Sequence, residues 1–269
     1  MNNQPPHLVL GILQARVSSS RLPGKVLKPI LGRPMLQLQL ERLARCRSID
    51  RLVVATSTED SDDPIVSLCK DIGVDTFRGS LTDVLDRFYQ AAQQYRPDII
   101  VRLTGDCPLA DPHLIDDGID YFLSHGLDYV SNCAPRTFPI GLDFEIFSMR
   151  VLEIAWTEAA LPSEREHVTP YIQNHPEKFS IGNVTRESDL SHHRWTVDEP
   201  ADFEFVGQIY QALYPQNPDF TTADILSFLE RRPELVRINA HITAGAGYQK
   251  SLEEDKRFLA ERQVERDTP

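Results

Sequence analysis

Apolar and polar positions alternate along the first half of the chain as they do in buried strands separated by helices. Residues 7–13 form a continuous apolar run with the length of a strand that is buried on both faces. Three later runs have the same character: 52–56, 74–77 and 98–103. Apolar residues at helical spacing predict helices between these runs, over 35–46, 62–69 and 82–95, with Thr82 capping the third. This alternation predicts an α/β fold with a mostly parallel sheet covered by helices.

The second half of the chain has a less regular pattern. Short apolar runs predict strands over 127–131, 144–147, 179–184 and 194–197. Helices are expected over 149–160, from Ser163 with a Ser163–Glu166 capping box, over 200–214 and over 251–266. No composition break marks a linker. We therefore expect a single domain over 1–269, with an insertion at about 132–183 that covers the site or forms a dimer contact.

Charge and cysteine content narrow the class of protein. The chain of 269 residues has a formal net charge of -12, which argues against a general nucleic-acid or membrane-surface partner. Its four cysteines have no zinc-ligand spacing and fit reduced thiols. The N-terminal apolar run is too short to span a membrane and lacks a preceding basic region. These features predict a soluble cytoplasmic protein.

A basic loop follows the first predicted strand. Within residues 14–25 it contains Arg16, Arg21 and Lys25, together with three consecutive serines and a Pro-Gly pair. Loops at the carboxyl ends of parallel strands bind ligands in α/β folds, and clustered cations suit a polyphosphate. The loop contains neither a Walker motif nor a dinucleotide-binding glycine pattern. A solvated basic loop is the alternative interpretation.

Two aspartates each close a predicted strand. Asp106 follows the run 98–103, and Asp198 precedes the helix that Pro200 opens. Two such carboxylates, completed by phosphate oxygens, would form a magnesium site. A turn aspartate that accepts local N–H bonds is the alternative for Asp106. For the neighbouring Glu199 and Asp202 we expect helix capping.

Two further polar groups have the residue types of a binding site. Asp143 and Glu145 share one face of a predicted strand, and residues 164–167 (Glu-Arg-Glu-His) lie in the first turn of a predicted helix. An exposed strand edge and ordinary helix-surface charges are the alternatives.

Several sequence blocks together resemble one enzyme family, the cytidylyltransferases named for a spore-coat polysaccharide biosynthesis protein. This family is related to the acylneuraminate and 3-deoxy-manno-octulosonate cytidylyltransferases. The blocks stand in the family's order and span nearly the whole chain: 14–25, 55–57 with 62–63, 78–80 with 83–87, 102–109, 141–145, 165–169 and 194–198. Ser18 stands where the family often has glycine, which raises the question of how closely the backbone approaches phosphate.

The resemblance implies a three-layer α/β/α fold of the nucleotide-diphospho-sugar transferase type, and a reaction. An acceptor oxygen attacks the α-phosphorus of CTP, which gives a CMP conjugate and pyrophosphate. Metal and cations would carry most of the catalysis, because the attacked group is a polyanion. The implied cofactor is Mg²⁺ or Mn²⁺, and the implied partners are CTP, a small anionic or polyhydroxylated acceptor and a second copy of the chain.

The resemblance also assigns roles to residues. The catalytic residues would be Arg16, Lys25 and Asp106. Nucleotide binding would fall to Gln14, Ala15, Arg16, Ser20, Arg21, Lys25, Arg78, Asp83 and Thr104, with Arg87 either nearby or structural. The metal ligands would be Asp106 and Asp198. The acceptor would contact Asp143, Glu145, Arg165, Glu166 and His167.

The sequence leaves two other functions open. A glycosyltransferase that uses a nucleotide sugar would share the fold and an acidic metal site, and a non-catalytic nucleotide-binding protein would share the fold alone. The acceptor is also open: a nonulosonic acid, another sugar acid and an alkylphosphonate all fit.

Overall fold

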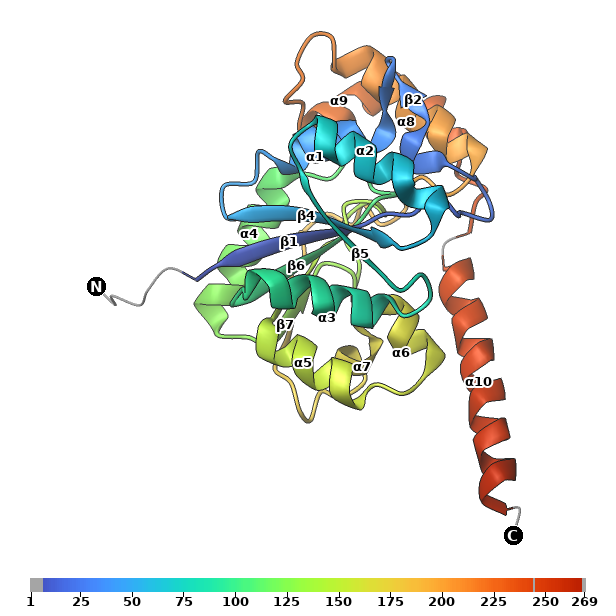
Figure 1. Cartoon of the computed structure of the whole chain (residues 1–269). Helices are drawn as coiled ribbons and strands as arrows, with labels where there is room; N and C mark the ends of the chain where they lie inside the picture. The colour runs from blue at the N-terminus through green and yellow to red at the C-terminus, as the bar shows by residue number, and fades with distance from the viewer. Residues whose placement is uncertain (1–6, 244, 268–269) are drawn as a thin grey trace.

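The computed structural model describes residues 7–243 and 245–267, and a seven-stranded sheet forms its centre (Figure 1). The strand order is β5-β4-β1-β6-β8-β7-β9. The strands span Val9–Gln14 (β1), Arg51–Ser57 (β4), Asp75–Gly79 (β5), Ile99–Thr104 (β6), Tyr129–Ser131 (β7), Glu145–Ser148 (β8) and Ile181–Asn183 (β9). Of these strands, β8 alone runs antiparallel to its neighbours. A small hairpin, Pro29–Ile30 (β2) with Arg33–Pro34 (β3), lies outside this sheet.

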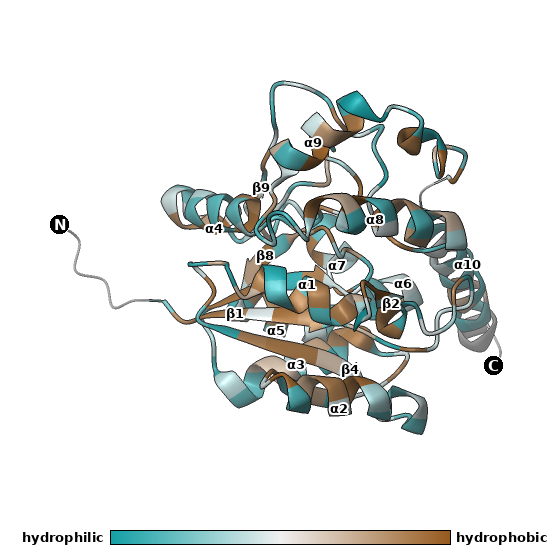
Figure 2. Cartoon of the chain, turned by 90° about the horizontal axis from the view of Figure 1, so that it is seen from above, coloured by the Kyte–Doolittle hydropathy of each residue, from teal (hydrophilic) through white to brown (hydrophobic). Residues whose placement is uncertain are grey.

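Helices cover both faces of the sheet and bury one apolar cluster on each. One face packs against Met35–Leu43 (α1), Asp63–Asp71 (α2), Pro112–His125 (α4), Pro200–Leu213 (α8) and Thr222–Arg231 (α9). The other packs against Val84–Tyr95 (α3), Met149–Glu158 (α5) and Pro170–Gln173 (α7). Figure 2 shows apolar residues concentrated on central strands such as β4 and on the helices beside them. The predicted three-layer α/β/α fold with a mostly parallel sheet is therefore confirmed.

Two elements lie at the edge of these layers. The short helix α6 (Pro162–His167) packs against α3, and the long helix α10 (Ala246–Asp267) packs against α6 (Figure 1). The described part of the chain contains no helix that is both long and apolar enough to span a bilayer.

Local details differ from the sequence prediction. Helices α4 and α9 were not predicted, and residues 194–197 form only an isolated bridge between Arg194 and Ile140. Asp83 rather than Thr82 caps α3. The predicted Ser163–Glu166 capping box is wrong, because the Glu164 carboxylate accepts the backbone N–H groups of residues 160 and 161.

The segment 132–183 contributes β8, β9 and the helices α5, α6 and α7 to the same layered body. Its role in acceptor binding or dimerisation stays a prediction.

Candidate functional site

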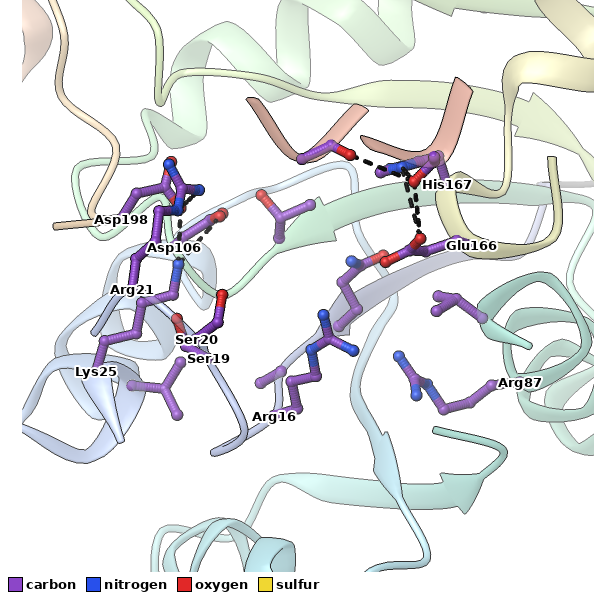
Figure 3. Close-up of a pocket in the computed structure, with 18 of the residues that line it drawn as sticks. Arg16, Ser19, Ser20, Arg21, Lys25, Arg87, Asp106, Glu166, His167 and Asp198 are labelled. Carbon is purple, nitrogen blue, oxygen red and sulfur yellow. Dashed lines mark hydrogen bonds and ion pairs between the residues drawn. The ribbon is translucent and has the colours of Figure 1, made fainter. Parts of the chain in front are cut away.

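A cavity of about 380 Å³ opens at the carboxyl ends of β1 and β6 (Figure 3). The two strand ends are joined, since the backbone N–H of Gly105 donates to the carbonyl of Gln14 at 2.8 Å. A Cβ atom on Gly105 would lie 3.0 Å from that same oxygen, so glycine permits this close approach. The residues that line the cavity are Gln14, Ala15, Arg16, Ser19, Ser20, Arg21, Lys25, Val26, Val84, Arg87, Arg102, Thr104, Gly105, Asp106, Glu166, His167, Asp198, Gly247, Lys250 and Ser251.

The basic loop is fixed to the neighbouring strand β4 through a buried acid. Asp62 accepts the backbone N–H of Val17 at 2.7 Å and the hydroxyl of Ser57 at 2.5 Å. Burial alone would raise the pKa of Asp62, but these hydrogen bonds hold it below its usual value. The sequence offered Asp62 only as a helix start, and its role in holding the loop was missed.

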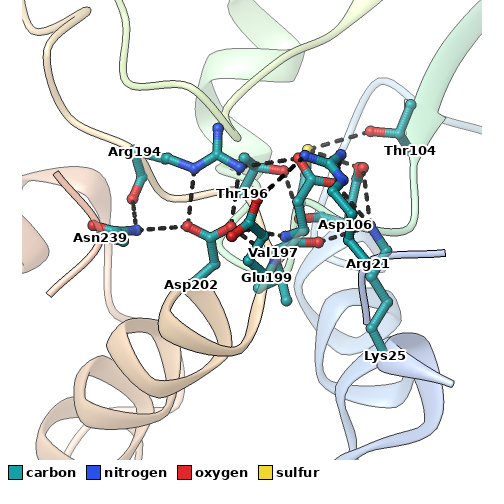
Figure 4. Close-up of polar contacts among 12 residues, drawn as sticks. Arg21, Lys25, Thr104, Asp106, Arg194, Thr196, Val197, Glu199, Asp202 and Asn239 are labelled. Atoms are coloured by element: carbon teal, nitrogen blue, oxygen red, sulfur yellow. Dashed lines mark hydrogen bonds and ion pairs between the residues drawn. The ribbon is translucent and has the colours of Figure 1, made fainter. Parts of the chain in front are cut away.

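Lys25 joins the basic loop to both predicted metal ligands. Its ammonium lies 3.0 Å from Asp198 Oδ1 and 3.5 Å from Asp106 Oδ2, and it donates to the carbonyl of Val197 at 2.7 Å (Figure 4). A lysine in a basic loop is ordinarily exposed, but the Lys25 side chain is only 11% exposed. The carboxylates of Asp106 and Asp198 converge on one point, and the Lys25 ammonium occupies it.

Lys25 and Asp106 stabilise each other's charged forms. Burial alone would lower the pKa of Lys25, but Asp106 and Asp198 raise it above its usual value. Burial would likewise raise the pKa of Asp106, yet the Lys25 ammonium holds it below the ordinary range of a carboxyl.

A buried ion pair between Arg194 and Asp202 positions Asp198. The Arg194 guanidinium bonds both oxygens of Asp202, at 2.9 and 3.0 Å, and also reaches Asp198 Oδ2 at 3.0 Å (Figure 4). Asp202 accepts the backbone N–H groups of Asp198 and Glu199, so its predicted capping role is confirmed. Glu199 occupies the N-cap position, but its own side chain makes no capping hydrogen bond. Arg21 adds a third cation, 2.9 Å from Asp198 Oδ1.

The middle of the cavity is positively charged. Within residues 7–243 and 245–267, neither Arg16 nor Arg87 forms an ion pair with an acid. Arg87 is 2% exposed, and burial together with the nearby charge of Arg16 lowers its pKa to about 10. Two cations without an acid between them would be stabilised by an anionic ligand.

Glu166 and His167 line the opposite end of the cavity from Lys25, with Arg16 between the two ends in the view of Figure 3. They lie in the last turn of α6, whereas the sequence placed them in the first turn of a helix. Burial lowers the pKa of His167, and the charges of Arg102 and Arg16 lower it further against the opposing effect of Glu166. His167 is therefore neutral at pH 7.

Five of the predicted site residues lie outside the cavity, because each is engaged in a contact elsewhere in the fold. Arg78 pairs with Asp63 at 2.6 Å. Glu145 is buried beneath the cavity wall, where it pairs with Arg102 and accepts the hydroxyl of Tyr129 at 2.5 Å. The other three engage partners through two further ion pairs, Arg165 with Asp83 and Arg136 with Asp143. Their charges are therefore engaged in ion pairs of the fold, and none of the five residues lines the cavity.

Comparisons with known proteins show which proteins this chain is similar to. Residues 10–218 match the family model described as Cytidylyltransferase. The spore coat polysaccharide biosynthesis protein SpsF of Bacillus subtilis is 34% identical over 84% of this chain and 95% of its own length. A 3-deoxy-manno-octulosonate cytidylyltransferase of Zea mays is 36% identical over 46% of this chain and 42% of its own length.

A solved structure is similar to this chain in three dimensions as well as in sequence. The structure of a cytidylyltransferase from Leptospira borgpetersenii has a TM-score of 0.82 and 36% identity, and the match covers 89% of this chain and all of that one. The family match includes most of the chain, the basic loop and both aspartates. The protein belongs to the cytidylyltransferase family.

Proposed function

We propose that this CTP-dependent nucleotidyltransferase transfers CMP to an oxygen of a small acidic, hydroxylated acceptor, for the synthesis of a cell-surface polysaccharide or glycoconjugate. One observation carries the proposal: a single cavity joins the basic loop and two converging carboxylates at one end to Glu166 and His167 at the other. A triphosphate and an acceptor can therefore occupy the same cavity.

The triphosphate is assigned to the loop end. Arg16, Arg21 and Lys25 supply positive charge, and the hydroxyl of Ser20 lies in the same wall. Attack on a phosphorus within a polyanion requires charge neutralisation more than a strong nucleophile. Gln14, Ala15 and Thr104 line the cavity at the ends of β1 and β6, where the nucleoside would lie. Arg78 and Asp83 are not proposed as contacts of the nucleotide, because each is engaged in an ion pair and neither lines the cavity.

The residues present fit a divalent metal ion. Asp106 and Asp198 already converge on one cation, the ammonium of Lys25, so they can hold another in its place. The described residues contain no cluster of three or more acid, histidine or cysteine side chains for a metal ion, so phosphate oxygens must complete the coordination. Bound there, Mg²⁺ or Mn²⁺ would neutralise charge on the phosphates. Lys25, displaced from the two carboxylates, would become available to the triphosphate.

The acceptor is assigned to the other end. Glu166 and neutral His167 offer hydrogen-bond acceptors to hydroxyl groups, and the unpaired Arg16 and Arg87 offer positive charge to an acid group. Asp143, Glu145 and Arg165 are not proposed as contacts, because none of them lines the cavity and the charge of each is already paired.

A glycosyltransferase that takes a ready-made nucleotide sugar is the weaker alternative. Such enzymes typically use a D-x-D pair on one loop, whereas this chain has Asp106-Cys107-Pro108. Cys107 is buried, and burial raises the pKa of its thiol well above the usual value, so it does not replace a second carboxylate.

A pyrophosphate-release assay with CTP and Mg²⁺ tests the proposed function. The acceptors are 3-deoxy-manno-octulosonate, an acylneuraminate and a hydroxyalkylphosphonate. We expect release with at least one acceptor, little release without one, and severe loss in Asp106→Asn. Asp120→Asn, an exposed change on α4, is the matched control. Release that needs no acceptor, or equal activity in both variants, would contradict the proposal.

A further inference from the structure

The start of α10 forms part of the cavity wall, although it lies far along the chain from the rest of the site. Gly247, Lys250 and Ser251 line the cavity, and α10 runs beside α6 at the edge of the molecule (Figure 1). The family match ends at residue 218, so these residues lie outside the part of the chain that the family model describes. No motif in the sequence pointed to them.

Ser251 connects the two polar residues at this end of the cavity. Its hydroxyl donates to Glu166 Oε2 at 2.8 Å, and its Oγ lies 2.9 Å from His167 Nε2. The Ser251 residue is only 2% exposed, so water competes little for these bonds. Glu166 Oε2 and His167 Nε2 are themselves 4.0 Å apart, which is too far for a direct hydrogen bond. The serine is therefore the link between them.

The single hydrogen of the Ser251 hydroxyl determines which ring nitrogen of His167 carries a proton. Ser251 has one hydrogen, and when that hydrogen points to Glu166, the oxygen can only accept from the histidine. His167 must then be protonated at Nε2. In the neutral ring this leaves Nδ1 as the hydrogen-bond acceptor.

Neighbouring contacts hold α10 in the register that this arrangement requires. One helical turn beyond Ser251, Asp255 Oδ1 accepts the backbone N–H of Ser163 at 2.8 Å. On the preceding turn, the ring of Tyr248 meets the His167 ring edge-on, with centroids 5.2 Å apart. Residues 248, 251 and 255 share one face of the helix, and this face meets α6.

We propose that the first two turns of α10 complete the acceptor end of the site, and that Ser251 is the positioning residue that holds His167 as its Nε2–H tautomer beside Glu166. The acceptor, a hydroxylated acid, then meets Nδ1 of His167 as a hydrogen-bond acceptor for its hydroxyl group. This inference rests on the proposed function for the identity of the reaction. The tautomer itself does not depend on it.

The first test measures the histidine ring directly and needs no acceptor. Multiple-bond ¹H–¹⁵N spectra report which ring nitrogen of each histidine carries the proton, and the signals lost in His167→Gln identify His167. We expect the Nε2–H form in the wild type and loss of this preference in Ser251→Ala. Ser124→Ala is the matched control, because that hydroxyl also contacts a histidine ring, His125 Nδ1 at 3.1 Å, on the surface of α4. An unchanged His167 tautomer in Ser251→Ala would overturn the proposal.

The second test separates the two substrates. With CTP and 3-deoxy-manno-octulosonate, Ser251→Ala should raise the KM of the acceptor by about fivefold, the loss expected for one buried hydrogen bond. The KM of CTP should not change, and Ser251→Thr, which keeps the hydroxyl, should retain more of the acceptor affinity. An equal rise in both KM values would overturn the positioning role. The proposed function is tested separately, by calorimetric binding of CTP to the wild type and by turnover of the wild type with the acceptor panel. Failure of the proposed function would therefore be recognised independently of the tautomer result.

Discussion

Lys25 has two roles at the residue scale, because it neutralises two carboxylates and belongs to the proposed triphosphate site. In Lys25→Ala the partly buried acids lose their shared partner, while Arg21 and Arg194 still neutralise Asp198. We expect the free energy of unfolding to fall by about 2 kcal/mol in urea titrations, below the range for a fully buried pair. Turnover should fall on the order of a hundredfold.

Magnesium provides the control for this prediction. If Asp106 and Asp198 can hold a divalent ion, Mg²⁺ should stabilise Lys25→Ala more than it stabilises the wild type, where the ammonium competes. The exposed Lys70→Ala on α2 should behave as the wild type. Equal stabilisation of all three proteins by Mg²⁺ would mean that Asp106 and Asp198 do not bind the metal ion.

The aspartates themselves can be tested by charge removal. Asp106→Asn and Asp198→Asn keep the size of each side chain but remove its charge, so each should weaken Mn²⁺ binding in the presence of CTP. Manganese titrations followed by electron paramagnetic resonance measure this affinity. In the wild type, chelator should abolish activity and Mg²⁺ should restore it. Full activity in excess chelator would contradict the metal assignment.

At the scale of elements, the start of α8 holds Asp198 in place through a buried carboxylate. Asp202 is fully buried, and its hydrogen bonds with Arg194 hold its pKa below the ordinary 3.8 in spite of burial. A carboxyl whose pKa is lower in the folded state contributes its full stability above the unfolded pKa. That contribution is lost as pH falls through the folded pKa.

Asp202→Asn should therefore be destabilised by a constant amount above about pH 5, and the difference from the wild type should shrink as pH falls below 3.8. Chemical unfolding across this pH range measures the difference. A difference that does not depend on pH would mean that the charge of Asp202 does not stabilise the start of α8.

Helix α6 carries two glutamates with opposite expected roles. Glu164 accepts the N–H groups of residues 160 and 161, so Glu164→Gln should cost roughly 1 kcal/mol of stability and leave kinetics nearly unchanged. Glu166 lines the cavity, so Glu166→Gln should raise the acceptor KM and leave CTP binding in the absence of acceptor unchanged. Thermal melts of the two variants, measured together with their acceptor kinetics, distinguish the two roles. Unaltered kinetics in Glu166→Gln would exclude Glu166 from the site.

The sequence predicted those parts of the site that follow single strands. Apolar runs predicted β1 and β6, and the basic loop and Asp106 each follow one of these strands, where the structure brings Lys25 and Asp106 together. Partners far apart in sequence were not visible. Arg165 pairs with Asp83 across 82 positions, and Glu145 pairs with Arg102 across 43, and these ion pairs engage residues that were predicted as ligand contacts. The contact of Ser251 with α6 depends on the path of the whole C-terminal segment, and no local pattern encodes it.

At the scale of the whole molecule, an acidic chain surrounds a cavity whose middle is basic. The formal net charge is -12, yet Arg16 and Arg87 line the cavity and neither forms an ion pair with an acid among the described residues. Such a contrast favours a small anionic substrate over an extended polyanion. The homodimer stays a prediction, and light scattering on the purified chain measures it.

The central claim is that this one cavity joins CMP to an acidic acceptor. Its most direct test is to incubate the enzyme with CTP, Mg²⁺ and the acceptor panel, and to follow the products by ³¹P NMR and mass spectrometry. We expect a CMP conjugate and pyrophosphate in equal amounts, with one acceptor preferred. CTP left intact beside every acceptor would contradict the proposed reaction.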